Sequence, residues 1–207
     1  ERRGLSPNRA AFTAVIGRFA RRGDADGALE AFRAMTQAGE KPDVVAMNAV
    51  LDGLAKAGNM TAACLWLAQM EKESLNPTVV SYTAIINGYA KQGDTSGAGR
   101  IFDGMANAGL RPDKYAFNAM IKCHATARDP AGAAAWLAKI RQADLEPDVL
   151  SYTTLMGAFA RCADVEGAAD VLASMLAAGV RPNEITWGTL FSACANARDD
   201  VWAAVAF

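Results

Sequence analysis

Few side chains in this 207-residue chain could catalyse a reaction or bind a metal ion. His124 is the only histidine, so a Ser–His–Asp or Cys–His device would have to use it, and we interpret it as structural. The four cysteines form no CxxC pair and share no metal-ligand spacing, which indicates free thiols: Cys64, Cys123, Cys162 and Cys194. No phosphate-binding glycine loop is present. We therefore predict no catalytic residue, no metal, no cofactor and no enzymatic activity.

Basic side chains, in contrast, recur at a fixed interval of 35 residues: Arg21, Lys56, Lys91 and Arg161. The formal net charge is −1, from 21 Lys+Arg against 22 Asp+Glu, so any nucleic-acid site must be a local row of cations. Such a row suits a phosphate backbone. Thr126 and Asn196 interrupt it, so binding should weaken towards the C-terminus. The same cations would also be explained as charges favoured at helix C-termini by the macrodipole.

The elements that carry this row repeat with the same period. Six of the seven prolines lie 35 residues apart: Pro7, Pro42, Pro77, Pro112, Pro147 and Pro182. Large apolar residues five and nine positions after each proline share one helical face. Glycines such as Gly23 are suited to ending this first helix, and a side-chain acceptor then caps a second one: Asp24, Asn59, Asp94, Asp129, Asp164 and Asp199.

Each repeat is therefore predicted to be a helical hairpin whose apolar face is buried only by stacking on its neighbours. We begin each repeat two residues after its proline and number its residues from one. The prediction is a single all-α array over residues 1–207, with complete repeats at 9–43, 44–78, 79–113, 114–148 and 149–183, and partial repeats at 1–8 and 184–207. Neither end carries a polar capping helix, so we expect a longer array. No apolar run approaches the roughly 18 residues of a membrane-spanning helix.

The repeat resembles the pentatricopeptide repeat (PPR) family, in its P-type subclass. The resemblance rests on PDVVAMNAVLDGLAKAGN and PTVVSYTAIINGYAKQGD in the first-helix half and GALEAFRAMTQAGEKPD in the second, and it covers essentially the whole chain. Tetratricopeptide repeats have a period of 34 and different landmark residues. The resemblance implies a right-handed α-solenoid whose first helices line a concave surface. It also implies binding of single-stranded RNA, one base per repeat.

By this resemblance, the fifth and last residues of each repeat contact one base edge. The pairs are Thr13 with Asp43, Asn48 with Thr78, Thr83 with Asp113, Asn118 with Asp148, and Thr153 with Asn183. An ionised Asp is only an acceptor and suits the ring N–H of guanine or uracil, whereas Asn suits adenine or cytosine. The family rule adds that a fifth-position Thr favours purine and Asn favours pyrimidine. The implied site is 5′-G-pyrimidine-G-U-A-3′, with the second base the least well discriminated.

The second residue of each repeat is expected, again by resemblance, to sandwich neighbouring bases: Val45, Val80, Tyr115, Leu150 and Ile185. Ala10 is small there, which weakens readout by the first repeat. The thirteenth residues are the basic row described above, which the resemblance assigns to phosphate. The alternative for the Thr/Asn column is a solvated polar stripe without a ligand.

The resemblance implies a protein of the mitochondrion or chloroplast that stabilises, splices, processes or translates a transcript by occupying it, with no membrane and no small-molecule substrate. A second interpretation is a structural PPR subunit of a large organellar ribonucleoprotein, such as a ribosome, in contact with its other proteins. The near-neutral charge and the few complete repeats favour this reading. A third is peptide binding, which predicts a groove rich in Arg and Lys without the Thr/Asn and Asp/Asn columns.

Overall fold

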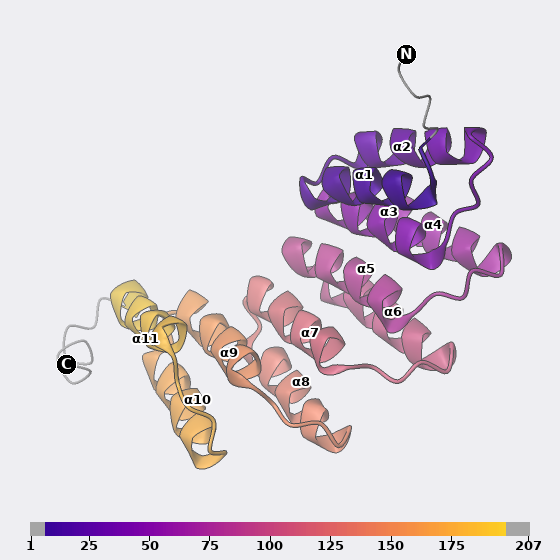
Figure 1. Ribbon diagram of the computed structural model, residues 1–207. Helices are drawn as coiled ribbons and strands as arrows, with labels where there is room; N and C mark the ends of the chain where they lie inside the picture. Colours follow the sequence, from indigo (N-terminus) through magenta and orange to yellow (C-terminus); the bar gives the residue numbers. More distant parts are fainter. Residues whose placement is uncertain (1–6, 198–207) are drawn as a thin grey trace. The chain divides into compact units, whose positions relative to one another are not determined.

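A computed structural model describes residues 7–197 of the chain. Within them the structure consists of α-helices without strands (Figure 1). The helices are α1 (Arg9–Arg21), α2 (Ala25–Gln37), α3 (Val44–Lys56), α4 (Met60–Lys72), α5 (Val79–Gln92), α6 (Thr95–Asn107), α7 (Lys114–Thr126), α8 (Pro130–Gln142), α9 (Val149–Arg161), α10 (Val165–Ala177) and α11 (Glu184–Ala197). Successive odd-numbered helices begin 35 residues apart, and the predicted all-α solenoid of helical hairpins is confirmed.

The second helix of each described hairpin begins at the predicted cap. Side-chain oxygens accept a hydrogen bond from the backbone N–H three residues later at each of these positions: Asp24, Asn59, Asp94, Asp129 and Asp164. Each cap satisfies one of the N–H groups that a helix N-terminus leaves without an intrahelical partner. Asp199, predicted to be the next cap, lies outside the described residues, as do parts of the two partial repeats.

The first helices end through a residue in the left-handed conformation. Gly23, Gly58 and Gly93 have φ of 72°, 78° and 68°, as the sequence predicted. The fourth and fifth repeats lack this glycine, yet Arg128 and Ala163 adopt φ of 57° at the same register. Because both are ordinary L-residues, each stores strain that glycine would avoid.

The two helices of a hairpin approach closely at a glycine near the start of the second. A Cβ on Gly27 would lie 2.5 Å from the Phe19 ring, and one on Gly167 would lie 2.2 Å from the Phe159 ring. An aromatic ring of the first helix therefore packs directly on the backbone of the second. This contact fixes how the first helix, which carries the candidate site, sits on its partner.

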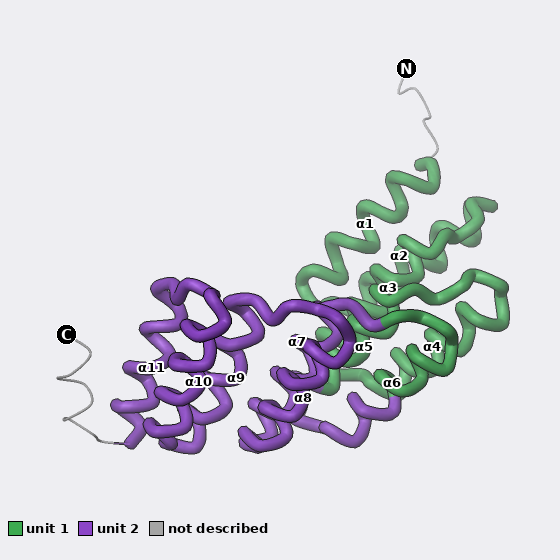
Figure 2. The backbone as a smooth tube through the Cα atoms, turned by 90° about the horizontal axis from the view of Figure 1, so that it is seen from below, with its two compact units in different colours: residues 1–89, 101–111 green, residues 90–100, 112–207 purple. Residues whose placement is uncertain are grey.

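The structure forms two compact units, residues 1–89 with 101–111 and residues 90–100 with 112–207 (Figure 2). In the first unit, α1 packs against α2 and α3, and α3 packs against α2 and α4. In the second, α7 packs against α8 and α9, and α9 packs against α8, α10 and α11. First helices are thus neighbours within each unit.

The core of each unit is made by the predicted apolar columns. Ile16, Met47 and Leu51 are buried in the first unit, and Ile121 and Met156 in the second. Trp187, which lies five residues after Pro182 in the same apolar column, is 41% exposed on α11. No helix in residues 7–197 is both long and apolar enough to cross a bilayer.

Candidate nucleic-acid interface

A row of exposed apolar side chains marks the start of the first helices. The second residues of the repeats are between 54% and 72% exposed: Val45, Val80, Tyr115, Leu150 and Ile185. Single exposed apolar residues are ordinary on protein surfaces. These side chains, however, occupy the same position of α3, α5, α7, α9 and α11. Packing does not explain this regularity, because none of them is buried in the core.

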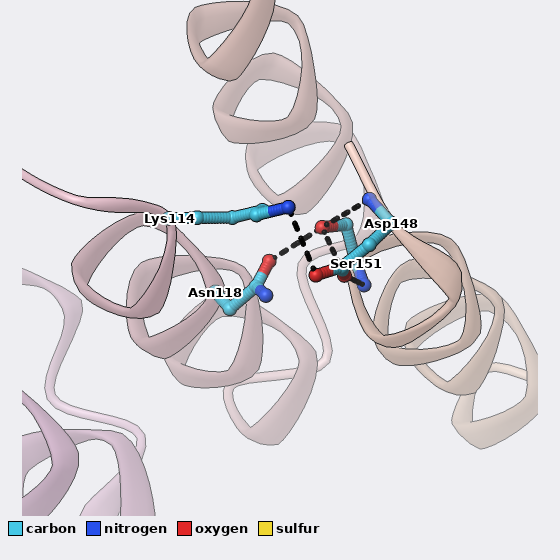
Figure 3. Close-up of polar contacts among 4 residues, drawn as sticks. All are labelled: Lys114, Asn118, Asp148 and Ser151. Carbon is cyan, nitrogen blue, oxygen red and sulfur yellow. Dashed lines mark hydrogen bonds and ion pairs between the residues drawn. The ribbon is translucent and has the colours of Figure 1, made fainter. Parts of the chain in front are cut away.

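On α3 and α7 the fifth residue is an asparagine, about one turn after the exposed second residue, and each asparagine is bound by a serine from the next first helix. The Ser81 hydroxyl donates to Asn48 Oδ1 at 2.6 Å in the first unit. In the second, the Ser151 hydroxyl donates to Asn118 Oδ1 at 2.7 Å (Figure 3). Asn118 is only 7% exposed, whereas Asn48 is half-buried. Both amides are therefore held in place before any ligand arrives.

The fifth-position threonines differ from one another. The Thr13 hydroxyl donates back to the Arg9 carbonyl at 2.9 Å, within its own helix. Thr153 Oγ1 lies 3.0 Å from Thr186 Oγ1 of α11. Thr83 Oγ1 is buried and has no hydrogen-bond partner among the described residues. An unpaired buried hydroxyl costs free energy, so Thr83 is destabilising in the absence of a partner.

The last residue of a repeat is also the N-cap of the next first helix. One oxygen of each of these side chains accepts from the backbone N–H three residues later: Asp43, Asp113, Asp148 and Asn183. The second carboxylate oxygen of Asp43 lies 3.6 Å from Arg9 Nε. That of Asp148 lies 3.3 Å from Lys114 Nζ. In each of these two repeats, a basic first residue, Arg9 or Lys114, therefore forms an ion pair with the acidic last residue.

The charge of Asp148 follows from these contacts. Partial burial by itself would raise the pKa of the carboxyl group. Hydrogen bonds from the Ser151 N–H and hydroxyl, together with the Lys114 ammonium, outweigh that effect, and the pKa lies below its usual value. Asp148 is therefore an ionised hydrogen-bond acceptor at neutral pH.

The predicted phosphate-binding residues are exposed at the C-terminal ends of first helices: Arg21, Lys56, Lys91 and Arg161. Lys56 forms an ion pair with Asp52 one turn earlier. In the second unit, Arg161 lines an open groove of about 430 Å³ between α9 and α11, together with Ile185 and Gly188. Asn196 Nδ2, at the thirteenth position of α11, donates to the Ala160 carbonyl at 2.9 Å.

His124 is a structural bridge within the fourth repeat. Its Nε2 accepts from Trp136 Nε1 at 3.0 Å, and its Nδ1 lies 2.8 Å from Asp129 Oδ2. Asp129 at the same time caps α8 through Gly132 N–H, and this bond, assisted by His124, lowers the pKa of the carboxyl group. The histidine thus ties both helices of the hairpin together. The cysteines of the described residues are free thiols, as predicted.

Sequence reasoning missed the residues at the third and first positions that touch the predicted base-reading groups. Ser81, Ser151 and Thr186 carry the third-position hydroxyl, while Arg9 and Lys114 carry the first-position cation. A signal for the hydroxyls was present, because a Ser or Thr three residues after a polar cap has the spacing of a capping box. Their second contact, to a residue 33 positions earlier, has no local sequence signature.

Comparison with known proteins identifies the family. The family sequence model described as "PPR repeat family" matches residues 42–88, 77–126 and 147–196. A second one, described as "Pentatricopeptide repeat domain", matches residues 1–52. Together these matches cover most of the chain, which belongs to the pentatricopeptide repeat family, as its sequence suggested. No curated protein sequence matches the chain.

Several solved structures share the fold. The crystal structure of the maize protein PPR10 is 29% identical, with a TM-score of 0.69 over 90% of this chain. PPR10 in complex with an 18-nt psaJ RNA element gives 20% identity and a TM-score of 0.50, covering 98% of this chain and 40% of that one. The PPR domain of Arabidopsis thaliana protein-only RNase P 1, in complex with tRNA, is 19% identical with a TM-score of 0.59. The match covers 75% of this chain and 82% of that one. The chain spans about a quarter (27%) of the maize PPR10 structure.

Proposed function

We propose that this chain binds single-stranded RNA in a sequence-selective manner, one base per repeat, with the order 5′-G-pyrimidine-G-U-A-3′. The base edges are read by the fifth and last residues of the repeats, the bases are sandwiched by the second residues, and phosphates contact the thirteenth. The solved RNA complexes of maize PPR10 and of the RNase P 1 PPR domain support the proposal through their shared fold.

One observation carries the proposal: four first helices, α3, α5, α7 and α9, pair an exposed large apolar residue with a polar residue three positions later. Tyr115 and Asn118 form such a pair on α7, and Leu150 and Thr153 on α9. Residues three apart lie on one face of a helix. An unpaired base needs a stacking surface for its ring and hydrogen-bonding groups for its edge, and this pair offers both.

The proposed role is to occupy a transcript in a mitochondrion or chloroplast, so that nucleases are blocked or RNA structure is remodelled during processing, splicing or translation. No bond is broken by the chain itself. The near-neutral charge favours one alternative, a structural subunit of an organellar ribonucleoprotein that is held partly by other proteins. Isolated chain that fails to bind RNA would favour that alternative.

Fluorescence anisotropy with short labelled RNAs tests the proposal. The RNA containing GUGUA or GCGUA should bind more tightly than an RNA of the complementary sequence, and a duplex of the same sequence should bind more weakly than either single strand. Equal affinity for all three RNAs would contradict sequence-selective binding.

The salt dependence tests the phosphate contacts separately. Four cations that each neutralise one phosphate predict a slope of roughly −3 for log K against log salt concentration on a single strand. The Arg161→Gln variant should reduce the magnitude of this slope by about 0.7 without changing base preference. A flat salt response would exclude the basic row from the interface.

A further inference from the structure

Both fifth-position asparagines in the array are followed, 33 residues later, by a serine at the third position of the next repeat. The pairs are Asn48 with Ser81 and Asn118 with Ser151. Thr13, a fifth-position threonine whose hydroxyl is satisfied within its own helix, is followed by Ala46 at that position. A third-position hydroxyl thus accompanies both asparagines, although one also lies beside a threonine, in the pair Thr153 and Thr186.

The proton of the Ser151 hydroxyl has two acceptors in reach, Asn118 Oδ1 and Asp148 Oδ1, and the first is the closer. Ser151 is fully buried, and its Oγ accepts from the Asp148 backbone N–H at 3.2 Å, which leaves the hydroxyl proton for an acceptor. Asn118 Oδ1 lies at 2.7 Å, whereas Asp148 Oδ1 lies at 3.0 Å and already accepts the Ser151 N–H. Figure 3 displays this network, with the Lys114 ammonium on the other oxygen of Asp148.

The second pair leaves still less freedom. Ser81 Oγ accepts from the Thr78 N–H at 3.0 Å, and besides Asn48 its one other printed side-chain contact within residues 7–197 is the Thr78 hydroxyl at 3.5 Å. The Ser81 to Asn48 distance of 2.6 Å suits an O–H···O bond and is shorter than an ordinary N–H···O bond. The geometry therefore places the amide oxygen, and not the amide nitrogen, against the serine.

An amide held in this way presents only its N–H groups to a ligand. Asn118 Nδ2 makes no hydrogen bond within residues 7–197 and is not among their buried unpaired atoms, so it keeps access to solvent. Beside it, the Asp148 carboxylate presents only acceptors. Uracil carries a carbonyl oxygen next to its ring N–H, and this pair complements the N–H of Asn118 and the carboxylate of Asp148. Cytosine carries an amino donor and a ring acceptor at the same positions.

We propose that Ser151 and Ser81 are positioning residues for base selection: each fixes the amide of Asn118 or Asn48 with its N–H groups toward the RNA. Without the serine the amide can flip and present its oxygen, which repels the uracil carbonyl and accepts from the cytosine amino group. The inference rests on the proposed function. It adds a third residue, contributed by the following repeat, to the two that read each pyrimidine.

The test uses the full chain with Ser151→Ala and Ser151→Thr. Alanine is the native residue at this register in Ala46, and threonine is native in Thr186, whose Oγ1 accepts from the Asn183 N–H at 3.2 Å and approaches Asn183 Oδ1 at 3.0 Å. Both variants should therefore fold, which circular dichroism can verify. Ser81→Ala repeats the experiment where the last residue, Thr78, carries no charge.

Anisotropy is measured with RNAs that differ only at the fourth base, as U or C, and with RNAs that differ only at the first. Ser151→Ala removes the one hydrogen bond that holds the Asn118 amide in this orientation. We therefore expect it to lower the preference for U over C about fivefold. Preference at the first base should not change, and Ser151→Thr should retain the wild-type ratio at the fourth.

Two failures are distinguishable. If the wild-type chain itself has no base preference, the proposed function fails. If the wild type prefers U but Ser151→Ala keeps the same ratio, or weakens all RNAs equally, base reading stands and the positioning role is overturned.

Discussion

Truncation of the exposed tyrosine on α7, Tyr115→Ala, separates RNA binding from folding. The side chain is 72% exposed, so its removal should change the free energy of unfolding by no more than about 0.5 kcal/mol. Stacking of a base on an aromatic ring contributes roughly 1–3 kcal/mol, which predicts RNA binding about 5 to 150 times weaker. Anisotropy gives the affinity, and thermal unfolding gives the stability.

A matched control exists on a second helix. Leu65 on α4 is 69% exposed, nearly as much as Tyr115, but it does not belong to a first helix. Leu65→Ala should leave RNA affinity unchanged, and Tyr115→Phe should retain most of it because the ring remains. Equal affinity of Tyr115→Ala and the wild type, or equal losses in Tyr115→Ala and Leu65→Ala, would refute the assignment of the second-position row to base stacking.

Three further predictions concern the scaffold. Ala163→Gly should stabilise the fold by about 1 kcal/mol in chemical denaturation, since glycine tolerates φ of 57° without steric cost. Gly167→Ala should destabilise it by about 1–3 kcal/mol, because the new Cβ would lie 2.2 Å from the Phe159 ring. At pH 8 the exposed Cys162 should be alkylated well before Cys123, in which burial, assisted by Asp94, raises the pKa to about 11.

Each of these has a contrary result. Ala173→Gly is the control for Ala163→Gly. Ala173 is an exposed residue inside α10, where glycine should destabilise the protein by about 1 kcal/mol. Equal effects of the two glycine substitutions would show that backbone strain at residue 163 is not the cause. A Gly167→Ala variant as stable as the wild type would disprove the tight hairpin contact. Faster alkylation of Cys123 than of Cys162 in the native state would contradict its burial.

The fold could be predicted from the sequence because its determinants are local. The prolines, the glycines at positions 23, 58 and 93, and the caps such as Asp24 each act within a few residues, and the structure confirms those that it describes. The structure shows Arg128 and Ala163 in the same left-handed turn at the equivalent position of the next two repeats, which the sequence did not predict. Nothing in their own residue types indicates that conformation, which only the register of the repeat imposes.

The contacts around the candidate site could be predicted only in part. Periodicity indicates which face of a helix Asn118 occupies, but not that it is 7% exposed or that Ser151 binds its oxygen. Such contacts depend on side-chain rotamers at the packing of two neighbouring first helices. The capping role of Asp148 has a local signal in its place directly before the next helix, but its ion pair with Lys114, 34 residues earlier, has none.

The most direct test of base reading is a single substitution at a fifth position, Asn118→Thr, assayed against RNAs that carry each of the four bases at the fourth site. Thr153 beside Thr186 is the native precedent for a threonine facing a third-position hydroxyl, so the variant should fold. We predict that the preferred fourth base changes from uracil to guanine, with no change at the other four sites. An unchanged ranking of the four bases at this site would contradict the claim that each repeat reads one base.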